Sequence, residues 1–396
     1  MPHLTKGQRI LIVYSSFGDG HFQVADAIRA ALAERGAGPI AMVDLLAEAH
    51  PRWNALSRWA YFYSTTHCPW LYGISYDLTN PVKPNPLLSR AFLSIGRKKM
   101  RELVERLQPD ALIHTFPYLA VQSLNARKGA RIPSYTVVTD YVLHSRWVHP
   151  DTDGYFAATE QVKRSLVAAG VDGERVAVSG IPVRPVFERS IDKARVVAEK
   201  GLDPEKKYVL ISAGAYGVLG QTRQMTETVL RRSSFDLILI CGKNEKLFRR
   251  MQIAYRDEPR VRVIGFAERM EEWMAAASCL ITKAGAVTLT EAMALGLPMI
   301  VYRSLPGQEQ GNARVLSERG ALLEARNPDE LEGCLAAVCR EDVRRGLIRA
   351  MQAVHRESAA ARIADRVLHS AESVNLLPVK TAKRRFGRDV RRWRTN

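Results

Sequence analysis

The sequence predicts an α/β protein built from two Rossmann-like, doubly wound parallel sheets with a cleft between them. The first observation is the length, because 396 residues suffice for two domains of ordinary size. The second is an alternation of short apolar runs with longer segments of helical period, which indicates parallel strands joined by helices. The third is a cluster of one glycine and two prolines at Gly180–Pro185, which suits a hinge.

The N-terminal half begins with a strand, a glycine loop and a helix. Arg9–Tyr14 is an apolar run of strand length, and the apolar side chains of His21–Arg35 recur every three or four residues. Similar apolar runs predict further strands at Ala111–His114, Ser134–Val138, Tyr208–Ser212, Leu237–Cys241, Val261–Ile264, Leu280–Thr282 and Met299–Tyr302. Because ligands of such sheets bind beyond the carboxyl ends of the strands, the loops after these runs are where we expect chemistry.

The pattern divides the chain near its middle. Strands and helices alternate up to Gly180–Pro185, and the alternation restarts at Tyr208. We therefore expect one domain over residues 1–184, a second over residues 185–375, and a basic tail over residues 376–396.

Positive charge is concentrated in two segments. The formal net charge is +17, and residues 52–101 and 380–396 each carry +7, which leaves +3 for the rest of the chain. Amphipathic aromatic rings favour the headgroup boundary of a bilayer and cations favour anionic lipids, so the first segment is a candidate for docking on an anionic membrane; alternatively, its rings pack in the core. The tail is either a basic helix or disordered. The nine aromatic residues of the first segment are Trp53, Trp59, Tyr61, Phe62, Tyr63, Trp70, Tyr72, Tyr76 and Phe92.

Composition also indicates a compartment. The N-terminus has no basic stretch followed by a long apolar core, and no run approaches the roughly 20 apolar residues that span a bilayer. The five cysteines include no C-x-x-C pair, which argues against a disulfide framework or a zinc ribbon. We expect a cytoplasmic protein that is peripheral on the cytoplasmic face of the cell membrane.

Several glycine loops follow predicted strands and precede helices. The loop that contains Gly214 is one, and the segment Lys283–Thr288 leads into a helix that carries Glu291. Backbone N–H groups at such helix starts can hold a diphosphate, and a carboxylate about one turn further can accept hydrogen bonds from a ribose diol. Alternatively, Glu291 only complements the helix dipole. The residues expected around the diphosphate are Gly214, Ala286, Val287 and Thr288.

The first glycine loop, Ser15–His21, places a histidine at a helix start. The positive end of a helix dipole disfavours imidazolium, so His21 would remain neutral and available as a base; alternatively, it merely begins the helix. A dinucleotide site is not favoured, because Gln23 stands where the G-x-G-x-x-G pattern needs glycine.

Metal and hydrolase chemistry lack support in the sequence. The D-x-D pattern at Asp151–Asp153 follows no predicted strand end and is interpreted as a solvated turn. No cluster of His, Asp or Glu has the spacing of metal ligands, and neither a P-loop nor a G-x-S-x-G motif occurs. We expect no metal and no other cofactor.

Taken together, these elements resemble the diacylglycerol glycosyltransferases, the group of the monogalactosyldiacylglycerol synthases and the processive diacylglycerol glucosyltransferases, with a domain like that of glycosyltransferase family 28. One departure is Ala286, where members of the family often have glycine or proline. The residues that carry the resemblance are Gly18–His21, Val138–Asp140 with His144, Trp147 and His149, Gly180–Arg184, Gly265–Phe266, Trp273–Met274, Leu280–Gly285, Glu291–Ala292, Gly296–Pro298 and Gly307–Asn312.

The resemblance implies a GT-B enzyme whose second domain binds a UDP-sugar and whose first domain binds the lipid acceptor. It implies that His21 is the base, that Glu291 holds the ribose and that Phe266 lies at the uracil site. Gln308 and Glu309 would reach the donor sugar. The acceptor would lie near Asp140, His144 and Trp147.

The expected reaction is the transfer of glucose from UDP-glucose to 1,2-diacylglycerol, with inversion to a β-linkage. UDP-galactose is the alternative donor, because one hydroxyl distinguishes the two sugars. A second alternative is the transfer of N-acetylglucosamine to a polyprenyl-linked precursor. A third is a non-catalytic protein that binds anionic surfaces or nucleic acid, which the net charge of +17 suggests. The basic segments contain no recognised RNA- or DNA-binding module, so we expect no nucleic acid partner.

Overall fold

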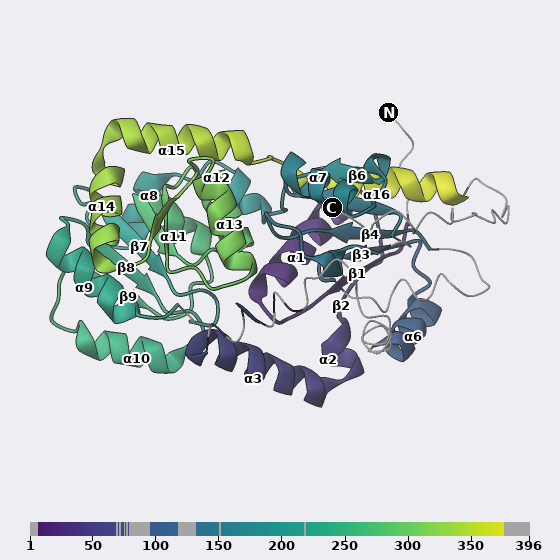
Figure 1. The fold of residues 1–396 in the computed structure, drawn as a ribbon, viewed down its shortest axis with the longest axis horizontal. Helices are drawn as coiled ribbons and strands as arrows, with labels where there is room; N and C mark the ends of the chain where they lie inside the picture. The colour runs from purple at the N-terminus through teal and green to yellow at the C-terminus, as the bar shows by residue number, and fades with distance from the viewer. Residues whose placement is uncertain are drawn as a thin grey trace, which may run out of the picture.

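The computed structural model describes residues 7–68, 96–117, 132–149, 152–217 and 219–375, with the single positions 70, 73, 74, 76 and 78. It contains two six-stranded sheets, both entirely parallel, each covered by helices. Figure 1 shows the two sheets side by side, the second on the left and the first on the right. The expected pair of doubly wound sheets is confirmed.

The first sheet has the order β2-β1-β3-β4-β5-β6. Its central strands are buried on both faces, which explains why they appear in the sequence as continuous apolar runs. The strands are β1 (Ile10–Tyr14), β2 (Ile40–Asp44), β3 (Ala111–His114), β4 (Ser134–Val137), β5 (Gly154–Ala157) and β6 (Val176–Val178).

The helices of this half include the one expected after the first glycine loop. That helix, α1, buries the apolar stripe from Val24 to Leu32 against the sheet. The helices and 3-10 turns are α1 (Asp19–Glu34), α2 (Leu45–Ala49), α3 (Pro51–His67), α6 (Arg97–Leu107), η1 (Ser145–Trp147), α7 (Glu160–Ala168) and η2 (Gly173–Arg175).

The second sheet has the order β12-β11-β10-β7-β8-β9. Its strands are β7 (Tyr208–Ser212), β8 (Asp236–Ile240), β9 (Val261–Ile264), β10 (Cys279–Thr282), β11 (Met299–Tyr302) and β12 (Leu323–Ala325). Its helices are η3 (Pro185–Glu188), α8 (Lys193–Glu199), α9 (Thr222–Arg232), α10 (Glu245–Ala254), α11 (Met270–Ala276), α12 (Ala286–Ala294), α13 (Gln308–Ser317), α14 (Pro328–Cys339) and α15 (Glu341–Val354).

The last described helix, α16 (Ala359–Asn375), crosses back to the first half. It packs against α1, and the Arg35 guanidinium pairs with the Asp365 carboxylate. Figure 1 shows α16, in yellow, beside the first sheet and away from the second. The sequence-based division into residues 1–184 and 185–375 did not predict that α16 packs on the first half. The tail over residues 376–396 lies outside the described residues.

All eight expected strands are present, each within one residue of the expected bounds. Four strands were missed: β2, β5, β6 and β12. β6 and β12 have only three residues each, β5 begins with a glycine, and β2 is only partly buried along most of its length, so their patterns did not stand out from the surrounding sequence. All five cysteines are free. Among the helices that the structure describes, none has both the length and the apolar character needed to cross a bilayer.

Candidate active site

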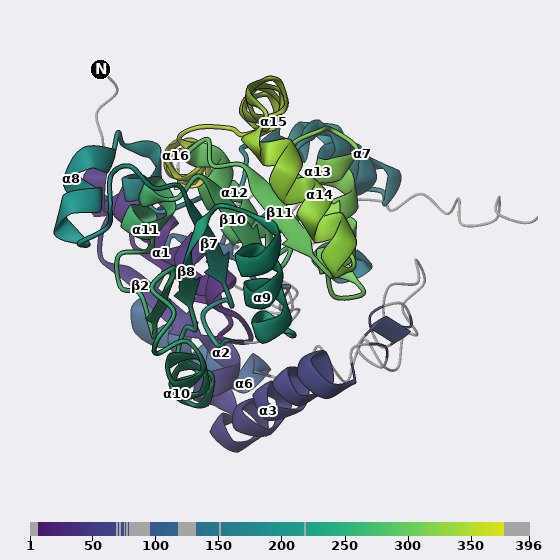
Figure 2. The ribbon, with the colours of Figure 1, turned by 90° about the vertical axis from the view of Figure 1, so that its left-hand side faces the viewer.

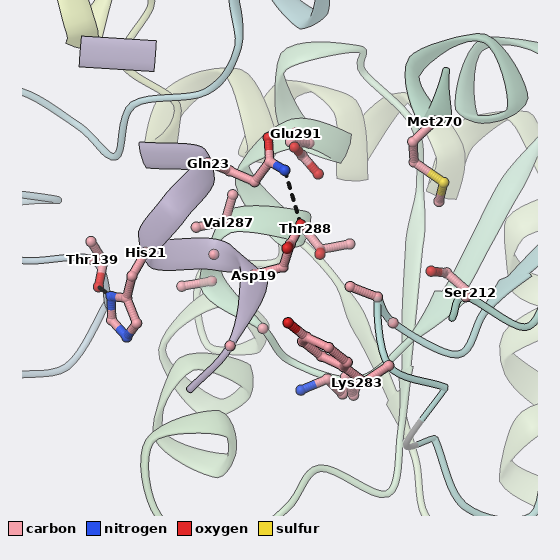
Figure 3. A pocket seen from close by; sticks show the side chains of 18 of the residues that line it. Asp19, His21, Gln23, Thr139, Ser212, Met270, Lys283, Val287, Thr288 and Glu291 are labelled. Carbon is pink, nitrogen blue, oxygen red and sulfur yellow. Dashed lines mark hydrogen bonds between the residues drawn. The ribbon is translucent and has the colours of Figure 1, made fainter. Parts of the chain in front are cut away.

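A cleft of about 290 Å³ lies between the two halves. Its walls include the loops after β1, β4, β7, β8, β9 and β10 and the first turns of α1, α12 and α13. These loops all follow carboxyl ends of parallel strands, where a doubly wound sheet binds its ligands. Figure 3 shows α1 with His21 on one side of this cleft and α12 with Thr288 and Glu291 facing it.

Most of the residues expected from the sequence line this one cleft. From the first half they are His21 and Asp140. From the second half they are Gly214, Phe266, Ala286, Val287, Thr288, Glu291, Gln308 and Glu309. Two expected acceptor residues, His144 and Trp147, are not among its lining residues.

His144 and Trp147 lie behind the cleft wall. The His144 side chain caps the η1 turn, because its Nδ1 accepts a hydrogen bond from the backbone N–H of Arg146. The His144 ring also packs edge-on against Tyr76, with centroids 4.6 Å apart. Trp147 is buried, and its ring centroid lies 6.4 Å from that of His21. Trp147 therefore packs beside the His21 ring and is not itself a lining residue of the cleft.

The His21 ring is held in one tautomer. Its Nδ1 lies 2.6 Å from the carbonyl oxygen of Thr115 and 3.2 Å from Thr139 Oγ1. Because a carbonyl oxygen only accepts, Nδ1 carries the proton and Nε2 remains an acceptor. Burial lowers the pKa of His21 from 6.5 to about 4, against an opposing contribution from the Thr115 hydrogen bond. The imidazole is therefore neutral at pH 7 and able to accept a proton.

The first turn of α12 is open toward the cleft. Its N-cap residue is Gly285, and no side chain among the described residues caps the helix there. The amides of Ala286, Val287 and Thr288 therefore lie at a helix start without a capping side chain, the usual setting for a bound phosphate. The two halves meet closely at this point, because a Cβ added at Gly20 of α1 would lie 3.2 Å from Val287 Cγ2.

Glu291 is buried on α12, one turn beyond this helix start. Burial raises the pKa of its carboxyl group to about 8; Arg184 lowers it, whereas Asp19 and Glu271 add to the rise. The Arg184 guanidinium donates to Glu271 at 3.1 Å and also lines the cleft. Glu291 is thus predominantly protonated at pH 7 in the free protein. A carboxylate that only complemented the helix dipole would have no need of this burial and protonation.

A second carboxylate lies at the start of α13. Lys283 Nζ donates to Glu309 Oε1 at 2.5 Å, and both side chains line the cleft. Glu309 is buried, yet its Oε2 has no hydrogen-bond partner within the described part of the chain. A buried carboxylate oxygen without a partner is costly, so this atom is suited to accept a hydrogen bond from a ligand hydroxyl.

Aromatic and cationic groups gather at the mouth of the cleft. Phe266 is half exposed, and Lys243 Nζ lies 5.0 Å from its ring centre. Lys243 and Arg58 of α3 both lie within 5.6 Å of the ring centre of Tyr216, from the loop after β7. Arg58 also donates to the Tyr216 hydroxyl at 3.2 Å. An exposed ring beside cations can stack on a base and can attract an anionic ligand.

Sequence reasoning assigned no role to several lining residues. Lys283, Arg184, Thr139 and Asn312 lie within the motifs quoted above, but a motif does not show which side chains face the cleft. Tyr61 was identified only as an aromatic residue of the basic segment, and the packing of α3 brings it to the cleft. Asp19 and Gln23 hydrogen-bond to each other at 2.9 Å in the first turns of α1, as Figure 3 shows.

No group of three His, Cys, Asp or Glu side chains that could hold a metal ion occurs among the described residues. Within the D-x-D pattern, the Asp153 carboxylate accepts from the Ser134 backbone N–H at 2.9 Å, and Thr152 is buried. The expectation of a solvated turn is therefore wrong for these two residues, and Asp153 helps to hold the start of β4. Asp151 lies outside the described residues.

Two parallel sheets that face each other across a cleft, with a helix start and a carboxylate on one side, define a glycosyltransferase fold of the GT-B class. Solved structures with this fold match the chain. MurG of Acinetobacter baumannii superimposes with a TM-score of 0.60 at 16% identity and covers 92% of this chain and 99% of its own. UGT89C1 of Arabidopsis thaliana, solved with UDP, gives 0.59 at 15% identity, covering 92% and 99%.

Sequence comparisons identify the family. Residues 21–183 match the family model described as monogalactosyldiacylglycerol (MGDG) synthase, and residues 214–367 match the glycosyltransferase family 28 C-terminal domain. The processive diacylglycerol β-glucosyltransferases of Bacillus mycoides and Bacillus cytotoxicus are 32% and 33% identical over 96% of this chain and 98% of theirs. The chain belongs to the diacylglycerol glycosyltransferase family.

Proposed function

We propose that this protein transfers glucose from UDP-glucose to the free hydroxyl of 1,2-diacylglycerol and forms a β-glycosidic bond. One observation carries the proposal: a neutral, buried imidazole and an uncapped helix start, one from each half, line the same cleft. Family membership supports the transfer of glucose to diacylglycerol, because the relatives that cover nearly the whole chain are named processive diacylglycerol β-glucosyltransferases.

In the proposed reaction, His21 accepts the proton of the acceptor hydroxyl as its oxygen attacks the anomeric carbon. The bond between that carbon and the UDP oxygen breaks, and the electron pair leaves with UDP. Attack from the face opposite to UDP inverts the configuration. General base catalysis of this kind contributes about 10² to 10⁴ in rate.

The departing diphosphate is stabilised by groups of the second half. The amides of the first turn of α12 point their dipole at the leaving group, and the cations of Lys283 and Arg184 line the same cleft. We propose that these groups suffice without a divalent ion. Full activity in EDTA is the expected result; loss of activity in EDTA with recovery on Mg²⁺ or Mn²⁺ would contradict it.

On the donor side, we propose that Glu291 holds the ribose diol and that Phe266 stacks near the uracil. Gln308 and Glu309 would accept hydrogen bonds from the sugar hydroxyls, and Glu309 Oε2 is free among the described residues to do so. Support comes from their shared position on the cleft.

The acceptor is proposed to enter along α3. A chain of aromatic contacts runs from Tyr61 to Phe17 (6.3 Å), from Phe17 to Phe116 (5.9 Å) and from Phe116 to His21 (5.0 Å). This apolar path leads from α3 to the base and suits an acceptor with long acyl chains. Asp140, which lines the cleft beside it, is the proposed hydroxyl contact in the first half.

The outer face of α3 is proposed to lie on an anionic membrane, on its cytoplasmic side. Exposed apolar side chains recur along α3 every three or four residues, and the Trp59 and Tyr63 rings stack at 5.3 Å. Figures 1 and 2 both show α3 along the lower edge of the molecule. The exposed residues are Trp53, Leu56, Trp59 and Tyr63, with Trp70 just beyond the helix.

The decisive experiment supplies diacylglycerol in mixed micelles with UDP-glucose, UDP-galactose or UDP-N-acetylglucosamine in turn. Chromatography of the lipid products would identify the donor and the number of sugars added. We expect β-glucosyldiacylglycerol from UDP-glucose. Product only from UDP-galactose would change the donor, and no glycolipid from any donor would overturn the enzymatic assignment.

A further inference from the structure

The loop after β4 contacts the proposed base and the donor side at the same time. Residues 139–142, here called the linking loop, begin with Thr139, whose hydroxyl lies 3.2 Å from His21 Nδ1. Further along, the Tyr141 hydroxyl lies 2.6 Å from Thr290 Oγ1 of α12. The position next to Thr290 is Glu291, the proposed ribose ligand. One short loop of the first half therefore connects the base with the donor helix.

Asn312 of α13 binds this loop with every polar atom of its side chain. Its Oδ1 accepts from the Tyr141 backbone N–H at 2.8 Å. Its Nδ2 donates to Asp140 Oδ1 at 3.0 Å and to the Ala284 carbonyl at 3.3 Å, just before α12 begins. The side chain is buried, so these three bonds replace water completely.

The backbone of α13 also lies against the linking loop. A Cβ added at Gly311 would lie 2.9 Å from both Val142 γ-carbons, closer than real side chains approach. The absence of a side chain at Gly311 thus allows α13 to approach the linking loop, and the hydrogen bonds of Asn312 fix the loop in that position. Gln308 and Glu309, the proposed sugar ligands, lie one turn earlier on the same helix.

We propose that Asn312 is a positioning residue, which sets the distance between His21 and the donor-binding ends of α12 and α13 by holding the linking loop. The inference deepens the proposed function and depends on it for the identity of the reaction. Its physical basis is that two reacting groups held on different domains need a rigid connection, since a misplacement of about 1 Å can cost about 10²-fold in rate.

The test compares Asn312→Ala with wild type. The variant removes all three hydrogen bonds, and we expect kcat to fall about 10- to 100-fold. The Kd of UDP should stay within about threefold, because the first turn of α12 and Glu291 remain. Gln310→Ala, an exposed side chain on the same helix, is the matched control and should retain wild-type kcat.

A second control separates positioning from stability. Asn327→Ala removes a helix cap in the same half, where Asn327 accepts from the Glu330 N–H, and it lies outside the cleft lining. It should lower the melting temperature without lowering kcat. If Asn312→Ala lowers kcat no more than this control does, or weakens UDP binding as much as it lowers kcat, the positioning role is wrong.

Asn312→Asp adds a test of the Asp140 contact. The new carboxylate still accepts from the Tyr141 amide but lies next to the Asp140 carboxylate. The contact between the two carboxyl groups therefore requires that one of them stays protonated. The ratio of its kcat to that of wild type should rise as the pH falls from 8 to 6. A constant ratio would contradict the contact. The other charged or titratable groups near Asp140 are Glu309, Lys283, Tyr61 and the Tyr141 hydroxyl.

Hydrogen exchange gives a readout that needs no turnover. The Tyr141 amide should exchange at least about tenfold faster in Asn312→Ala, whereas the Leu210 amide in β7 should not change. Unchanged exchange at Tyr141 would overturn the inference. If instead wild type transfers no sugar while this amide responds, the proposed function fails and the structural link stands.

Discussion

The chemistry of the proposed base is set by a few atoms around His21. Burial keeps the ring neutral, and the Thr115 carbonyl fixes which nitrogen bears the proton. Thr115 also returns a hydrogen bond, since its hydroxyl donates to the His21 carbonyl at 3.0 Å. This second bond holds the backbone of α1 to the end of β3, so the ring is oriented from both its side chain and its main chain.

His21→Ala is expected to lower kcat by about 10² to 10⁴, because it removes the only proposed proton acceptor for the diacylglycerol hydroxyl. UDP binding, measured by calorimetry, should stay the same. His369→Ala, an exposed histidine on α16, is the matched control and should keep full turnover. Turnover of the His21 variant within threefold of wild type would remove His21 from its proposed role.

We expect donor binding to be linked to the loss of a proton from Glu291. Its pKa of about 8 means that the free protein holds this proton at pH 7, whereas a ribose diol donates to the charged carboxylate. Binding therefore releases a proton below pH 8, and affinity should rise from pH 6 to pH 8 by up to about tenfold per unit.

Calorimetry with UDP-glucose, without acceptor and in buffers of different ionisation enthalpy, would measure this release. UDP-glucose is preferable to UDP because it lacks a terminal phosphate that titrates in this range. Glu291→Gln should bind more weakly at pH 8 and lose the pH dependence. A wild-type affinity that is flat between pH 6 and 8 would show that Glu291 is not deprotonated on binding.

Among the elements, α3 has two faces with different environments. Tyr61 points to the cleft, whereas Trp59, with 60% of its surface exposed, points to solvent. One helix can therefore contact a lipid surface and the acceptor path together. A large apolar face on a monomer surface that no described residue covers is usually a docking site.

Replacing Trp53 and Trp59 by serine should weaken binding to vesicles containing anionic lipid by about tenfold or more, because two large apolar side chains no longer enter the bilayer boundary. Sedimentation with vesicles measures this binding. Ile253→Ser is the matched control, since Ile253 is 78% exposed on α10 of the other half. Equal loss in both variants would argue against α3 as the docking element.

Turnover on a short-chain, water-soluble diacylglycerol should change little in the double tryptophan variant. This substrate needs no membrane docking, so it separates loss of docking from damage to the cleft. A large loss with the soluble acceptor would indicate that the two tryptophans support the active site instead.

At the scale of the whole molecule, the two halves share one apolar core. The cluster that begins at Ile10 of β1 continues through Val287 of α12 to Leu368 of α16. The chain crosses between the halves twice, near Gly180 and near Arg356, and a Cβ at Gly180 would lie 2.6 Å from that of Arg356. Domain closure is therefore expected to pivot at these adjacent crossings.

Ile363→Ala should lower the free energy of unfolding by about 2–5 kcal/mol, because Ile363 of α16 is completely buried in this shared core. Urea denaturation followed by circular dichroism measures the change. The same substitution at the exposed Ile253 should cost little. A loss below about 0.5 kcal/mol for Ile363→Ala would show that α16 does not stabilise the first half.

The fold class and the position of the cleft could be predicted from the sequence. Strands buried on both faces must be apolar throughout, and glycine loops must follow them where a backbone approaches a ligand, so β1, β7 and β10 and the loops after them could be located from local pattern. His21 and Glu291 were proposed from the glycine loops at strand ends, whereas Glu309 was proposed only from the resemblance to the diacylglycerol glycosyltransferases.

Which side chains meet could be seen only from the way the chain packs in three dimensions. The pairing of Asn312 with Asp140, 172 residues away, and the packing of α16 on α1 depend on long-range contacts that leave no local pattern. For the same reason, the sequence did not predict that His144 and Trp147 are buried outside the cleft lining. Periodicity reports how one segment alternates between apolar and polar surroundings, whereas the identity of those surroundings depends on how distant segments pack.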